Sequence, residues 1–128
     1  KWATAVTRTF TLKRLEEMGI FRSMITRDSI KRAVEILVRE AHPEKIILFG
    51  SCARNEAKDD SDVDFFVIEK KVADKRREMV RLRKALRPLR IPVDLMVSDE
   101  ATVKAWGSLP GTAMYWALKE GAVLYESA

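Results

Sequence analysis

Two short motifs in the middle of the chain carry residue types that handle phosphate and metal ions. Gly50-Ser51 follows an apolar run, and ten residues separate Ser51 from the pair Asp62 and Asp64 at the start of the next apolar run. A strand that ends in Gly-Ser and turns into a helix presents free N–H groups where the helix dipole favours an anion. Two carboxylates two residues apart on a strand share a face, and a cation relieves their repulsion. The spacing therefore favours a site for a phosphate group and divalent cations.

A third carboxylate, Asp94, lies in another apolar segment that reads as a strand. Three aspartates on adjacent strands would ligate two divalent ions at the ~3.5–4 Å separation of two-metal phosphoryl chemistry. The alternative is that one or more of them cap a helix or end a strand in solvent. A single cysteine, Cys52, and a single histidine, His42, cannot build a zinc site of the usual kind. Oxygen ligands remain, which favours Mg²⁺ or Mn²⁺.

The length of 128 residues fits one domain. Hydrophobic periodicity predicts helices over about residues 28–41, 72–87, 99–106 and 112–120, and strands over about 45–50, 61–69, 91–97 and 122–126. This alternation predicts an α/β (α+β) fold in which helices pack on one sheet. Residues 1–24 are expected to form an extension of unknown role, and residues 25–128 the domain. No apolar run approaches the ~20 residues of a membrane span, and the expected compartment is the cytoplasm.

The motifs resemble those of a known family. The spacing of Gly50-Ser51 and Asp62-x-Asp64 is similar to the GSx10DxD signature of the polymerase-beta-like nucleotidyltransferases. The longer segment "GSCARNEAKDDSDVDFF" resembles the form found in minimal nucleotidyltransferases (MNT), and the resemblance extends over residues 45–126. It implies a palm-like mixed β-sheet flanked by helices. Asn55 stands where the family usually has Gly, and Asn is the other residue that best tolerates a left-handed backbone.

The resemblance implies a role for each residue of the phosphate-binding motif. Gly50 would allow close approach of the backbone, and Ser51 with the following amides would hold the β- and γ-phosphates of a nucleoside triphosphate. Arg54 would neutralise phosphate charge.

The resemblance also assigns the three aspartates. Asp62 and Asp64 would bridge two Mg²⁺ ions, and Asp94 would complete the second ion's ligands and orient or deprotonate the acceptor. In-line attack on the α-phosphorus would then release pyrophosphate.

The resemblance further suggests a biological role. It implies transfer of AMP from ATP to a tyrosine of a HEPN-type ribonuclease toxin, with this chain as the antitoxin of a toxin–antitoxin pair. One alternative is a non-catalytic binding module that neutralises its partner by occlusion. Another is nucleotidyl transfer to a small molecule or an RNA end, for which a homo-oligomer would complete the acceptor site.

The segment Lys70 to Arg90 is strongly basic, with ten Lys and Arg residues against two acidic ones, whereas the whole chain carries a net +5. It is interpreted either as a face for nucleic acid or an acidic protein, or, by default, as the solvated side of an amphipathic helix. No sequence-specific RNA- or DNA-binding motif supports nucleic acid as the partner. Trp106, Tyr115 and Trp116 are expected in the core or at an interface rather than stacked on a base.

Overall fold

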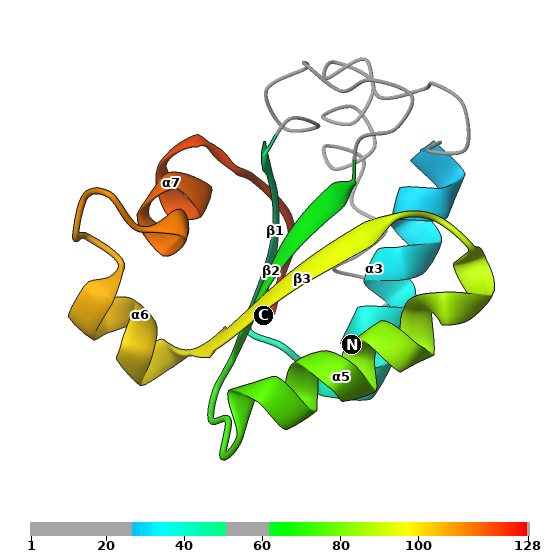
Figure 1. Ribbon diagram of the computed structural model, residues 1–128, viewed down its shortest axis with the longest axis horizontal. Helices are drawn as coiled ribbons and strands as arrows, with labels where there is room; N and C mark the ends of the chain where they lie inside the picture. The colour runs from blue at the N-terminus through cyan, green and yellow to red at the C-terminus, as the bar shows by residue number, and fades with distance from the viewer. Residues whose placement is uncertain (1–26, 51–61, 128) are drawn as a thin grey trace.

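The computed structural model of the chain describes residues 27–50 and 62–127 (Figure 1). The expected extension, residues 1–24, lies outside this part of the chain, as do Ser51, Cys52, Arg54 and Asn55. Within the described residues no helix is long and apolar enough to cross a membrane.

Four strands form one mixed sheet in the order β3-β2-β1-β4. The strands are β1 (Lys45–Phe49), β2 (Val63–Glu69), β3 (Val93–Asp99) and β4 (Ala122–Glu126). β1 pairs antiparallel with β2 and with β4, whereas β2 and β3 are parallel. A parallel pair needs a crossover between its strands, and α5 (Lys75–Leu86) supplies it. The predicted fold class is confirmed: the chain is α+β, with helices flanking a mixed sheet.

The helices cover the sheet from two sides (Figure 1). They are α3 (Arg27–Ala41), α5, the short 3₁₀ helix η1 (Arg87–Leu89), α6 (Glu100–Trp106) and α7 (Ala113–Glu120). On one side, alternate strand residues such as Phe65 and Val67 pack with the apolar stripes of α3 and α5. On the other side, Phe66 and Ile68 pack with Ala117 of α7 and Val103 of α6. Strand alternation therefore assigns each even-numbered residue of β2 to the α6/α7 side.

Polar caps set the start of three helices. Asp74 accepts a hydrogen bond from the Arg77 amide (3.1 Å), and Asp99 and Thr112 cap α6 and α7 in the same way. The basic helix was predicted from about residue 72, but it begins at Lys75 because the extended backbone and side chain of Asp74 form its N-cap. The second strand was predicted from residue 61, but the ladder begins at Val63, so Asp62 precedes it.

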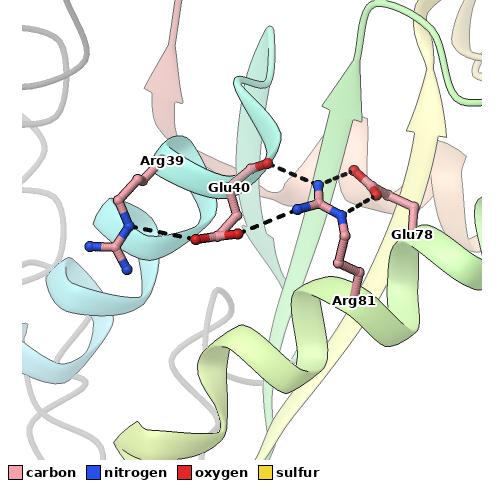
Figure 2. A network of polar contacts seen from close by, with 4 residues as sticks. All are labelled: Arg39, Glu40, Glu78 and Arg81. Carbon is pink, nitrogen blue, oxygen red and sulfur yellow. Dashed lines mark hydrogen bonds and ion pairs between the residues drawn. The ribbon is translucent and has the colours of Figure 1, made fainter.

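Arg81 joins the two helices on one side of the sheet (Figure 2). Its guanidinium donates to Glu78 on its own helix, at 2.8 Å from Nε to Oε1, and to the carbonyl oxygen of Glu40 in the last turn of α3, at 2.9 Å. A 3.4 Å contact with the Glu40 carboxylate completes the bridge, and Arg39 contacts the same carboxylate. These contacts hold α5 against the end of α3.

Beneath this network lies a buried acid, Glu69, at the end of β2. It is 8% exposed, and its Oε2 has no hydrogen-bond partner in the structure. Burial, together with the hydrogen bond to Glu78 and the charge of Glu78, raises the pKa of Glu69 to about 8, so this carboxyl is protonated at neutral pH. The hydrogen bond from Arg81 contributes most to lowering the pKa of Glu78. The pair therefore holds one proton, and it lies on Glu69.

Glu69→Gln is expected to remove a loss of stability at alkaline pH. The pKa of Glu69 is about 8 in the folded chain against an ordinary value of 4.5, so its stabilising contribution is present in acid and lost as pH rises through 8. Between pH 6 and 9 the wild type should lose on the order of 2 kcal/mol that the variant keeps. Urea unfolding of both chains at the two pH values measures the difference. The same pH trend in both chains would contradict the assignment.

Candidate functional site

Gly50 packs directly against the carboxylate of Asp64. A Cβ built on Gly50 would overlap the Asp64 oxygen Oδ2 and lie 3.1 Å from its Cγ. The backbone of Gly50 is also left-handed, at φ +77°, a conformation that side-chain-bearing residues rarely adopt. Two independent constraints therefore require glycine here, at the point where β1 ends beside the start of β2.

The register of the parallel strands brings Asp64 and Asp94 side by side. Their Cα atoms are direct partners in the β2–β3 ladder. Partners in a parallel pair point to the same side of the sheet, and Asp64 shares its side with Phe66 as Asp94 does with Met96. Both carboxylates therefore lie on the α6/α7 side. The prediction that the two motifs lie on adjacent strands is confirmed.

The burial expected of the aspartates is wrong for two of them. Asp64 is partly buried, but Asp62 is exposed just before β2, and the Asp94 side chain is 61% exposed. Asp94 was expected in an apolar setting, but β3 is an edge strand, and an edge residue at the start of its strand faces solvent. The aspartates thus form the rim of the sheet rather than a buried cluster.

Arg83 of α5 is a site neighbour that the sequence did not indicate. Its guanidinium forms an ion pair with Asp94, at 3.3 Å from an Nη atom to Oδ1, and both side chains are more than half exposed. The crossover helix brings the two residues together although eleven positions separate them. Without a known β2–β3 register, one arginine among ten basic residues in this segment carries no signal that would have singled it out.

The donor set fits a hard divalent cation in its chemistry. Asp62, Asp64 and Asp94 offer only carboxylate oxygens, which suit Mg²⁺ or Mn²⁺. In the described part of the chain, no three acidic, histidine or cysteine side chains are arranged to hold a metal ion. Asp94 is instead turned towards Arg83, in an exposed ion pair of the kind worth only about 0–1 kcal/mol. Reorienting Asp94 towards its strand neighbour costs little, so the residues present are compatible with a metal site.

The aromatic residues singled out in the sequence lie on α6 and α7. Trp106 is 57% exposed and Trp116 is 46% exposed, so the expectation of a core position is wrong for both. Tyr115 packs edge-on against Trp116, and Lys119 lies over both rings. These exposed aromatics belong to the helices on the same side of the sheet as Asp64.

Comparison with known proteins defines the class to which this fold and site belong. The family model for the polymerase beta nucleotidyltransferase domain matches residues 31–128. The match covers both aspartate-bearing strands, the crossover helix and the last strand, so the chain belongs to the polymerase beta nucleotidyltransferase family.

One solved structure supports the fold. The chain is similar to a protein from Sulfolobus solfataricus that is provisionally described as a nucleotidyltransferase, with a TM-score of 0.54 and 20% sequence identity. The likeness covers 91% of this chain and 87% of the other. At this identity it shows a shared fold. A search of the curated proteins found no match.

Arg83→Gln is expected to tighten metal binding at Asp94, because it removes the cation that now pairs with that carboxylate. An exposed pair is worth about 0.2–1 kcal/mol, so the Mg²⁺ concentration for half-maximal activity should fall by up to about fivefold. A Mg²⁺ titration of the transfer rate measures this, with Arg76→Gln on the same helix as the control for lost charge. A higher Mg²⁺ requirement in Arg83→Gln would instead give Arg83 a direct role in holding phosphate.

Proposed function

We propose that the chain is a Mg²⁺-dependent nucleotidyltransferase that moves AMP from ATP to a tyrosine of a partner HEPN ribonuclease toxin, and so acts as an antitoxin. The observation that carries the catalytic part is the close approach of Gly50 to Asp64 beside Asp94, in a chain of this family. The choice of ATP and of a toxin as acceptor rests on the resemblance of the Gly-Ser and Asp-x-Asp segment to the MNT proteins.

In this proposal each residue of the chain has a defined task. The left-handed turn at Gly50 leaves room for phosphate next to Asp64, and Ser51 and Arg54 hold and neutralise the triphosphate. Asp62, Asp64 and Asp94 are the residues that would hold Mg²⁺, which when bound neutralises phosphate charge and activates the acceptor oxygen. Asp94 lies on the edge strand, where an acceptor can reach it, and takes the proton of the attacking hydroxyl.

The double variant Asp62→Ala/Asp64→Asn tests the proposal. With radiolabelled ATP and Mg²⁺, the wild-type chain should label its toxin partner, and the double variant should not. Intact transfer by the double variant would refute the mechanism.

A second candidate function is neutralisation of the partner by occlusion, with no chemistry. The exposed side chains of Trp106 and Trp116 favour it, because tryptophan is enriched where protein interfaces gain most of their binding energy. Occlusion predicts that the double variant still silences the toxin in a co-expression growth test and that chelation of Mg²⁺ has no effect. Transfer to a small molecule or an RNA end is the remaining alternative, and it predicts labelled product without labelled protein.

A further inference from the structure

One face of α5 concentrates positive charge on the outside of the molecule. The buried side of this helix carries Leu82 and Leu86, and the opposite side presents five exposed cations around Val80. We call this surface the basic face of α5; its cations are Arg76, Arg77, Arg83, Lys84 and Arg87. At 1.5 Å per residue, they span about 16 Å along the helix. Figure 1 shows α5 lying across the outside of the sheet, with this face turned away from it.

Most of this charge is not neutralised within the described part of the chain. Across residues 27–50 and 62–127, Arg76, Arg77, Lys84 and Arg87 form no side-chain ion pair or hydrogen bond. The contrast is Arg81, which lies on the same helix but is paired with Glu78 and Glu40. A solvated helix face needs polar residues, but it does not need one sign of charge, and like charges at helical spacing destabilise a helix slightly. The one-sided charge therefore points to an anionic partner.

The chemistry of the face favours a phosphate backbone over a protein surface. Its only large apolar side chain is Val80, whereas the centres of protein interfaces are depleted of charge and enriched in aromatic residues. Most of the cations are arginines, whose planar guanidinium groups match phosphate oxygens in pairs. An open depression of about 580 Å³ runs beside the face, lined partly by Arg77, Val80 and Lys84. A strand of nucleic acid can thus contact a row of cations and a shallow groove together.

We propose that the basic face of α5 binds the phosphate backbone of nucleic acid, without selecting a base sequence. This inference is independent of the transfer reaction, because it involves neither ATP nor a metal ion. The net charge of +5 adds a long-range attraction to the local contacts. Arg83 connects the face to Asp94, so bound nucleic acid would lie along the helix that leads to the candidate site.

Fluorescence anisotropy with a labelled single-stranded oligoribonucleotide, in EDTA and over a range of salt, tests the proposal. Arg76→Gln/Lys84→Gln removes one arginine and one lysine from the face. Arg32→Gln/Lys104→Gln removes the same two residue types from exposed positions on α3 and α6. The face variant should bind more weakly at low salt, and its slope of log affinity against log salt should fall by about 2, or about 1 per lost phosphate contact. The control pair should keep the wild-type slope.

Three results would overturn the proposal. The first is no binding by the wild type at low salt, and the second is an equal loss in both double variants, which would reduce the effect to net charge. The third is displacement of the oligoribonucleotide by polyglutamate at equal charge concentration, which would assign the face to an acidic protein. The charge-preserving variant Arg76→Lys/Lys84→Arg keeps both contacts and should bind as the wild type does, which separates lost charge from altered folding.

Discussion

Asp64→Asn is expected to abolish nucleotidyl transfer, with a rate at least about 1,000-fold below that of the wild type. The substitution preserves the shape of the side chain and removes its charge. Asp64 is the residue that Gly50 contacts and that pairs with Asp94, so it occupies the centre of the candidate site. Loss of a central carboxylate removes several kcal/mol of electrostatic stabilisation, and each 1.36 kcal/mol is about a factor of ten in rate.

The same substitution should leave the fold intact. Removing one of several neighbouring carboxylates relieves repulsion, so the unfolding midpoint of Asp64→Asn should equal or exceed that of the wild type. Asp74→Asn is the matched control: it makes the same chemical change at the far end of β2, where Asn caps a helix as well as Asp does. Pyrophosphate release measures the rate for all three chains. Wild-type release by Asp64→Asn would remove Asp64 from the mechanism.

Gly50→Ala is expected to cost both stability and activity. A left-handed backbone is unfavourable for alanine by about 1–2 kcal/mol, and the added methyl overlaps the Asp64 carboxylate. The collision forces Asp64 out of its position, so transfer should fall by about 100-fold or more, as expected when a catalytic group moves by about an ångström.

Gly111→Ala separates the two causes. Gly111 also has a left-handed backbone, at φ +92°, but a Cβ there meets nothing within 4 Å. It should therefore lose a similar amount of stability to backbone strain and keep its transfer rate. Thermal unfolding and initial rates for both variants provide the comparison. Equal activity in the two variants would contradict the claim that Gly50 is needed for its contact with Asp64.

The sequence predicted the elements well because their signals are local. The apolar stripe of residues 30–41 predicted α3, Gly121 marked the end of α7, and Asp99 was one of two residues expected to cap α6. The adjacency of the aspartate-bearing strands was also predictable, since a basic helix between two strands indicates a crossover to a parallel neighbour.

Features that depend on register and layer order could not be read from the sequence. Asp94 lies on an edge strand, and only the strand order β3-β2-β1-β4 reveals this. The same holds for the pair of Arg83 with Asp94 and for the shared proton of Glu69 and Glu78, because each joins segments through tertiary packing. The roles proposed for Ser51 and Arg54 lie outside the described residues and remain predictions from the motif.

Intact-mass analysis of the HEPN partner after incubation with this chain, ATP and Mg²⁺ tests the central claim most directly. The account predicts a gain of one or more AMP units on the partner, located on a tyrosine by fragmentation, and no gain when the chain carries Asp64→Asn. An unchanged partner mass with a fully folded, nucleotide-bound chain would contradict the claim and leave occlusion or a non-protein acceptor as the function.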